Sequence, residues 1–139
     1  MESGALEALN YVERKRELRL TAEFTVWLGA LPPETINRVA AGLNRVLHGG
    51  PTLGRPEVDL IKGSRHHNMK ELRVGTSVRA LFVFDQRDPL MLIGGDKRGA
   101  WNDWYPRTIR DADRLYDQHR RDNGKGGSPR RRDPLSRGR

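Results

Sequence analysis

Cysteine is absent from the 139-residue sequence, and aromatic residues make up only 6% of it. Without cysteine the chain can form neither disulfides nor zinc sites with thiolate ligands, which suits a reducing compartment. No apolar run is long enough to cross a membrane. The first residues also lack the apolar stretch of a secretory signal, because Glu2 and Glu7 interrupt them. We therefore expect a cytoplasmic protein that does not associate with membranes.

Hydrophobic residues are also scarce, at 35% of the sequence, and the C-terminal end accounts for part of this deficit. From Asp122 onward the sequence DNGKGGSPRRRDPLSRGR has no aromatic residue and a single leucine. Such a segment cannot bury enough apolar surface to offset the entropy lost on ordering. We therefore divide the chain into an N-terminal extension (1–16), a folded domain (17–121) and a disordered basic tail (122–139).

Basic residues outnumber acidic ones, 26 to 18, and the formal net charge is +8. The excess is concentrated within residues 62–79, where Glu71 is the only acidic residue. The basic residues of this stretch are Lys62, Arg65, Lys70, Arg73 and Arg79. Binding to a polyanion depends on where cations lie rather than on their total. The pattern therefore predicts a cationic surface that holds RNA.

Two consecutive helices are predicted after a short strand at 17–21 (ELRLT). Thr21 suits the N-cap of the first helix, whose apolar residues recur at helical spacing. Pro32 ends this helix, and Pro33 suits the first position of the next. We expect the second helix to end at HGG, where Gly49 can adopt the left-handed turn. Together the two helices form a hairpin whose apolar face needs a sheet to cover.

Four short strands follow, in the runs EVDLIKG, NMKELRV, SVRALFVFD and LMLIGG, which are separated by turn-forming residues. Connections this short favour an antiparallel meander. After a loop over 94–107, Thr108 and Asp111 form a capping-box pattern that predicts a final helix. The fold class is therefore α+β, in the order β-α-α-β-β-β-β-α.

Side chains alternate along these strands, so Arg73 shares a face with Met69 and Glu71, and Arg79 shares a face with Leu81 and Val83. If the apolar faces cover the helix hairpin, both arginines project from the opposite, partly open face. The loop after the last strand carries cations and aromatic rings toward the same side, namely Lys97, Arg98, Trp101, Trp104 and Tyr105. Charged donors for phosphates beside flat rings for bases are what RNA binding requires.

Simpler interpretations of the same residues stay open. Arg73 and Glu71 could form an ordinary surface ion pair, and the aromatic residues could pack the final helix onto the sheet. His66 and His67 are adjacent and point opposite ways on an extended backbone, so they do not form a metal site together. We expect no metal and no cofactor.

The succession WLGAL, GPTLGRP, IKGSRHHNMKELR, VRALFVFD, LIGGDKRGAWNDWY and ADRLYDQH resembles the RelE/ParE superfamily of toxin–antitoxin toxins, closest to its HigB-like branch. The similarity covers about residues 17–120. The resemblance implies a compact toxin with two helices on an antiparallel sheet, neutralised by a cognate antitoxin, which we expect to be of the helix-turn-helix type. RNase members of this superfamily cleave mRNA, usually on the ribosome, by attack of the 2′-hydroxyl on the adjacent phosphate.

Carried over residue by residue, the resemblance implies catalytic phosphate-binding arginines at Arg73 and Arg79. It implies a cation at Lys97 or Arg98 and an aromatic residue at Trp104 or Tyr105. We take as catalytic candidates Arg73, Arg79, Lys97, His67 and Tyr105. Our RNA-binding candidates are Lys62, Arg65, His66, Lys70, Arg98 and Trp104.

This sequence departs from the RelE pattern, because Met69 and Glu71 stand where classical RelE chains carry lysines. Proton transfer must then fall to another group, and the residues leave four candidates: His66, His67, Lys70 and Tyr105. Two other functions also stay open. One is a ParE-like toxin that inhibits gyrase without cleaving RNA, and the other is a non-catalytic module that binds RNA or a protein partner.

Overall fold

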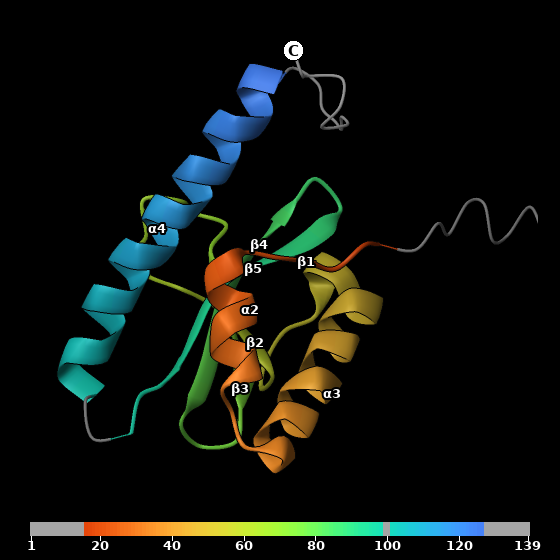
Figure 1. The fold of residues 1–139 in the computed structure, drawn as a ribbon, viewed down its shortest axis with the longest axis vertical. Helices are drawn as coiled ribbons and strands as arrows, with labels where there is room; N and C mark the ends of the chain where they lie inside the picture. Colours follow the sequence, from red (N-terminus) through yellow and green to blue (C-terminus); the bar gives the residue numbers. More distant parts are fainter. Residues whose placement is uncertain (1–15, 99–100, 127–139) are drawn as a thin grey trace, which may run out of the picture.

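The computed structural model describes residues 16–98 and 101–126, which form a five-stranded sheet with helices on both faces (Figure 1). The elements follow in the order β1 (Arg19–Leu20), α2 (Ala22–Gly29), α3 (Pro33–Gly49), β2 (Val58–Leu60), β3 (Lys70–Val74), β4 (Val78–Asp85), β5 (Asp88–Asp96) and α4 (Trp101–Gly126). A short 3₁₀ turn, η1 (Gly50–Thr52), follows α3. The predicted fold class and order of elements are confirmed.

The sheet has the strand order β1-β5-β4-β3-β2, and β2 to β5 form the predicted antiparallel meander. The small antiparallel sheet has one parallel addition that the sequence did not predict, because β1 pairs with β5 in parallel. A hairpin turn cannot make such a pair, but the α2–α3 hairpin and the three strands that follow separate β1 from β5 in sequence. The first strand is therefore placed by long-range pairing.

The helix hairpin forms as its sequence predicts. The Thr21 hydroxyl accepts a hydrogen bond from the backbone N–H of Phe24, and Pro33 is the first residue of α3. The end of α3 differs from expectation: Gly50, not Gly49, has the positive φ, at 70°. Gly50 is favoured there because an L side chain rarely adopts this backbone conformation.

Two separate hydrophobic cores lie on the two faces of the sheet. The first packs α2 and α3 against residues such as Leu72, Ala80 and Phe82. The second packs α4 against Met69, Leu81 and other residues of the opposite face. The expectation of a partly open face was therefore wrong over much of its area, because α4 covers it (Figure 1).

Helix α4 is longer than the sequence predicted. It begins at Trp101, not at Thr108, and includes Pro106. It also continues to Gly126, past the boundary expected at residue 121. Residues 1–15 and 127–139, which hold most of the expected extension and tail, lie outside the described residues.

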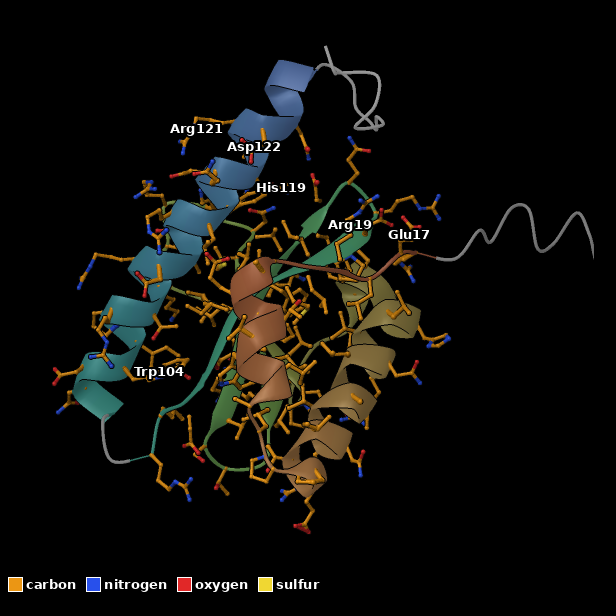
Figure 2. The ribbon with its side chains drawn as sticks, viewed as in Figure 1. Glu17, Arg19, Trp104, His119, Arg121 and Asp122 are labelled. Atoms are coloured by element: carbon orange, nitrogen blue, oxygen red, sulfur yellow. The ribbon has the colours of Figure 1, made fainter. Side chains whose placement is uncertain are left out.

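Adjacent glycines in β5 let a tryptophan approach each face of the sheet. A Cβ at Gly94 would collide with the ring of Trp27 from α2. A Cβ at Gly95 would lie 2.8 Å from Nε1 of Trp104, which belongs to α4. The two glycines of the sequence GGDK therefore serve close packing of both helical layers, and Trp104 is buried there (Figure 2).

Candidate functional site

Several charged side chains converge around the carboxylate of Glu71, which is 3% exposed. Glu71 lies on β3 on the face that α4 covers, because side chains alternate along the strand. Its carboxylate accepts a hydrogen bond from the Tyr105 hydroxyl at 2.7 Å and one from Arg73 Nε at 3.1 Å. Arg79 Nε lies 3.9 Å from the same carboxylate. We call Glu71, Arg73, Arg79, Lys97 and Tyr105 the Glu71 cluster.

Arg73 is the most accessible cation of the cluster, with 35% of its side chain exposed. Its guanidinium is shared between two carboxylates, since Nε donates to Glu71 and Nη2 donates to Asp59 on β2 at 3.2 Å. The hydrogen bond to Glu71 raises the pKa of Arg73 above its ordinary value, although burial opposes the shift. The side chain therefore stays protonated while it reaches solvent.

Arg79 lies directly opposite Arg73 in the antiparallel pair β3–β4, but it is only 7% exposed. Its Nη1 donates to the carbonyls of Gly75 and Val78, and its Nη2 donates to the carbonyl of Thr76. These bonds, of 2.9 to 3.2 Å, fasten the β3–β4 turn. Arg79 Nε has no hydrogen-bond acceptor among the described residues, so its N–H is available to a group that binds at the Glu71 cluster.

Lys97 follows β5 and is 5% exposed. Its backbone N–H donates to Ser77 in the β3–β4 turn at 2.9 Å, which ties its position to the turn that Arg79 holds. Its ammonium group lies 5.3 Å from the centre of the Tyr105 ring. Burial lowers the pKa of Lys97, and the nearby charge of Arg79 lowers it further.

Tyr105 comes from the first turns of α4 and closes the cluster from the helix side. Its ring packs edge-on against Trp104, with ring centres 4.9 Å apart. Burial raises the pKa of Tyr105, and the hydrogen bond to Glu71 raises it further. The phenol is therefore a neutral donor to the carboxylate at neutral pH.

The loop before β3 carries the other predicted cations to a different place. Arg65 and His66 both contact Asp117 of α4, and His66 Nε2 lies 2.8 Å from its carboxylate. His67 and Lys62 are exposed and have no polar partner among the described residues. The structure does not bring any of these four side chains into contact with the Glu71 cluster.

Two further candidates lie away from the cluster. Lys70 points to the opposite face of the sheet, where it donates to the carbonyl of Pro51 at 3.0 Å and lies over the ring of Phe84. Arg98 is 78% exposed and pairs with Asp96 at 2.7 Å. Arg73, Arg79, Lys97, Tyr105 and the ring of Trp104 are thus the predicted residues that the fold gathers in one place.

The ion pair between Arg73 and Glu71 was one of the interpretations left open by the sequence, but the burial of Glu71 and the contact of Arg73 with Asp59 were missed. The signal was present in part, because alternation put Glu71 on one face with Arg73 and with the buried Met69.

The arrangement leaves more positive than negative charge around Glu71. A group that gains negative charge, such as a phosphate under attack, is what such a field stabilises.

Comparison with known families matches residues 26–117 to the family described as Phage derived protein Gp49-like (DUF891). Two proteins of Mycobacterium tuberculosis (strain ATCC 25618 / H37Rv) that are named as toxins are similar to this chain. HigB2 is 44% identical over 100 residues, which cover 68% of this chain and 50% of HigB2. HigB3 is 47% identical over 89 residues, which cover 63% of this chain and 78% of HigB3. The chain thus spans half the length of HigB2.

Two solved structures share the fold. The toxin–antitoxin complex DinJ–YafQ of E. coli has a chain that matches with a TM-score of 0.50 at 12% identity, covering 63% of this chain and 99% of that one. The archaeal RelE–RelB complex from Pyrococcus horikoshii OT3 matches equally well, at 12% identity over 62% of this chain and 99% of that one, with a TM-score of 0.50. Within the described residues no helix is both long and apolar enough to span a membrane.

Proposed function

Since the chain belongs to the Gp49-like family, in the HigB-like branch of the RelE/ParE superfamily of toxin–antitoxin toxins, we propose that it is the toxin of a type II module that cleaves mRNA in the cytoplasm. The partners in this proposal are a cognate antitoxin, mRNA and the ribosome. Family membership supports the toxin and its antitoxin. The Glu71 cluster supports the choice of RNA cleavage.

One observation carries the proposal: Arg73, Arg79 and Lys97 meet Tyr105 around a single buried carboxylate. In the proposed reaction the 2′-oxygen forms a bond to the adjacent phosphorus, and the bond from phosphorus to the 5′-oxygen breaks. The products are a 2′,3′-cyclic phosphate and a 5′-hydroxyl. The nucleophile belongs to the substrate, so the protein needs only to align it, stabilise phosphate charge and move two protons.

The residues of the cluster suit these tasks. Arg73 reaches solvent and can bind the non-bridging oxygens with its planar fork of donors. Glu71 is assigned the proton of the 2′-hydroxyl, which would reach this buried carboxylate through the Tyr105 hydroxyl that donates to it. Lys97, whose pKa is lowered by burial, is suited to give a proton to the leaving 5′-oxygen. Arg79 holds the turn that positions Lys97.

Brief induction of the protein in cells, followed by mapping of new RNA 5′ ends, tests the proposal. We expect growth arrest, new 5′ ends within coding regions, and rescue by the product of a small neighbouring antitoxin gene. Growth arrest without new RNA ends would contradict the proposed RNA cleavage and favour a ParE-like gyrase inhibitor. Normal growth at a protein level verified by immunoblot would overturn the toxin proposal itself.

A further inference from the structure

The outer face of α4 carries a line of arginines opposite the face that packs on the sheet. At about 100° per residue in a helix, Arg107, Arg110, Arg114 and Arg121 fall within a sector of roughly 60°. All four are exposed. Figure 2 shows Arg121 on the side of α4 that points away from the sheet, whereas His119 lies on the side that faces it. We call these four residues the arginine ridge.

Two of the five aspartates of α4, Asp113 and Asp117, are held by the loop before β3 and do not neutralise the ridge. In contrast, the exposed Asp103 lies on the ridge side and Asp111 lies beside Arg114. Asp113 is 3% exposed and accepts hydrogen bonds from the Ser64 hydroxyl and the Arg65 backbone N–H. Asp117 binds the Arg65 guanidinium and His66. The loop before β3 therefore binds two carboxylates of α4 and places the exposed Arg65 beside the helix.

The cations of the ridge itself are largely unpaired. Arg107 and Arg110 have no polar partner within the part of the chain that the structure describes. Arg114 lies 3.7 Å from Asp111, at the limit of an ion pair, and is 63% exposed. Arg121 donates to the neutral amide of Gln118 and has no other polar partner among residues 16–98 and 101–126. Four guanidinium groups thus face solvent along about 21 Å of helix.

From this geometry we propose that the arginine ridge binds the phosphate backbone of RNA, outside the Glu71 cluster. The inference rests on the proposed function, since it names where a bound RNA would continue beyond the cleavage site. A row of planar donors fits successive phosphates, and it reads no base sequence. Tyr105 of the cluster lies on the same helix but on the side that faces the sheet, so the ridge is a separate site on the opposite side of α4.

The composition of the ridge favours RNA over a protein partner. The exposed large hydrophobic residues among the described ones are Leu20, Val26 and Leu60, and none belongs to α4. Protein interfaces gain most of their affinity from apolar and aromatic side chains that become buried at the centre. A face of charged and amide groups offers no such anchor, but it suits counterion release from nucleic acid.

The test measures the affinity of the full-length protein for a fluorescent 2′-O-methyl RNA 20-mer, which the proposed reaction cannot cleave, across a range of NaCl concentrations. The variant combines Arg107→Gln, Arg110→Gln and Arg114→Gln. Its matched control combines Arg38→Gln, Arg45→Gln and Arg87→Gln, which remove as many exposed charges elsewhere. A third variant carries lysine at the three ridge positions.

We expect the ridge variant to lower the slope of log K against log salt by about 2, since each single-strand phosphate contact contributes about 0.7. Its affinity near 0.1 M salt should fall by roughly tenfold or more, whereas the control should keep the slope of the wild type. The lysine variant should also keep it, because charge dominates this interaction. Melting curves should coincide, since all substituted side chains are exposed.

Three results would contradict RNA binding by the arginine ridge. They are an unchanged salt slope in the ridge variant, an equal loss of RNA affinity in the control variant, and no salt-dependent RNA affinity in the wild type. A ridge variant that still binds RNA but no longer copurifies with its antitoxin would assign this face to a protein. The RNase is judged separately, because Arg73→Ala should lose cleavage in cells while it lowers the binding slope by about 0.7 at most, the share of one phosphate contact.

Discussion

Arg73 and Arg79 face each other across two strands, yet the structure uses them differently. Both were expected to project from a partly open face of the sheet. That holds for Arg73, which reaches solvent beside two carboxylates. It does not hold for Arg79, which is buried and fastens a turn. Identical side chains in register thus divide into one suited to bind substrate and one that holds the framework.

The variant Arg73→Ala should keep the fold and lose RNA cleavage. Truncation removes a partly exposed side chain together with its ion pairs to Glu71 and Asp59, so it should cost about 1–2 kcal/mol in the free energy of unfolding, less than the loss expected for Arg79→Ala. Loss of one preorganised donor to the phosphate should slow cleavage by about 10²- to 10³-fold. Arg73→Lys should recover part of the rate, because it keeps the charge without the forked geometry. Circular dichroism and RNA 5′-end mapping measure both effects, and a fully active Ala variant would remove Arg73 from the mechanism.

The variant Arg79→Ala should instead unfold at a clearly lower temperature. It removes the donor to three turn carbonyls and leaves the Glu71 carboxylate with one cation fewer in a buried place. We expect a loss of about 3 kcal/mol in the free energy of unfolding, measured by urea denaturation. Arg38→Ala, an exposed arginine without a polar partner among the described residues, is the control. Equal stability of the two variants would contradict the role given to Arg79.

At the scale of elements, β5 positions α2 and α4 through close contacts at two adjacent residues. Gly94 faces Trp27 and Gly95 faces Trp104, so one strand positions both helical layers. Because Trp104 packs against Tyr105, the close contact of Trp104 with Gly95 also helps to position Tyr105 against Glu71. The same two glycines therefore link the packing of α4 to the geometry of the cluster.

We expect Gly94→Ala and Gly95→Ala each to destabilise the protein by about 1–3 kcal/mol, because the new methyl group overlaps an indole ring. Gly95→Ala should also reduce RNA cleavage, since it displaces Trp104 beside Tyr105. Gly54→Ala is a matched control, as nothing lies within 4 Å of its Cβ position. Thermal denaturation of the three variants gives the comparison. A Gly95→Ala variant as stable as Gly54→Ala would show that Trp104 does not need this close approach.

Helix α4 is held to the loop before β3 by Asp117, and this contact predicts a pH effect. Burial alone would raise the pKa of Asp117, but hydrogen bonds from Arg65 and His66 hold it below its ordinary value of 3.8. The carboxylate therefore contributes its full stabilisation above pH 3.8. As pH falls further, the unfolded chain takes up the proton first, and the stabilisation is lost until pH passes the lower folded pKa.

We expect Asp117→Asn to be less stable than the wild type at pH 7, with a shallower loss of stability below pH 3.8. Urea unfolding at several pH values between 7 and 2.5 measures this. Asp122→Asn, an exposed position on the same helix, should follow the wild type. If the two variants had the same pH profile, the contact of α4 with Arg65 and His66 would not contribute to stability.

The elements with a clear local pattern could be predicted from the sequence, and those fixed by distant contacts could not. Apolar spacing in α2 and α3 and alternation in β3 and β4 were sufficient to place those elements. The parallel pairing of β1 with β5 carries no local signal. The start of α4 was missed because the capping-box pattern of Thr108 and Asp111 favoured a later start, whereas the helix begins at Trp101 and includes Pro106.

The candidate site was predictable to a similar degree. Alternation put Arg73 and Arg79 on one face, and the end of β5 brought Lys97 to them. The burial of Glu71 depends on α4 lying over it, which no local pattern in β3 reveals. Lys70 was misplaced for a simpler reason: its alternation puts it on the hairpin face, and its charge alone drew it into the RNA-binding set.

At the scale of the whole molecule, the two cores predict which part of the C-terminal end folding requires. No residue beyond Tyr116 contributes to either core among the described residues, and residues 127–139 contain no aromatic side chain and one leucine. We propose that truncation after Gly126 leaves the melting temperature within about 2 °C of the full-length value. Truncation after Ala112 removes Leu115 and Tyr116 from the second core and should abolish cooperative unfolding.

The same truncation should weaken RNA binding, because residues 127–139 carry five arginines and one aspartate directly after the helix that bears the arginine ridge. Contacts of this kind are nonspecific, so affinity should fall alike for RNA of different sequences and the loss should shrink as salt rises. The anisotropy titration used for the ridge measures both. A drop of many degrees in melting temperature after truncation at Gly126 would place the segment in the folded domain. If the truncated protein kept its fold and its RNA affinity, the RNA-binding surface would be limited to α4 and the loop before β3.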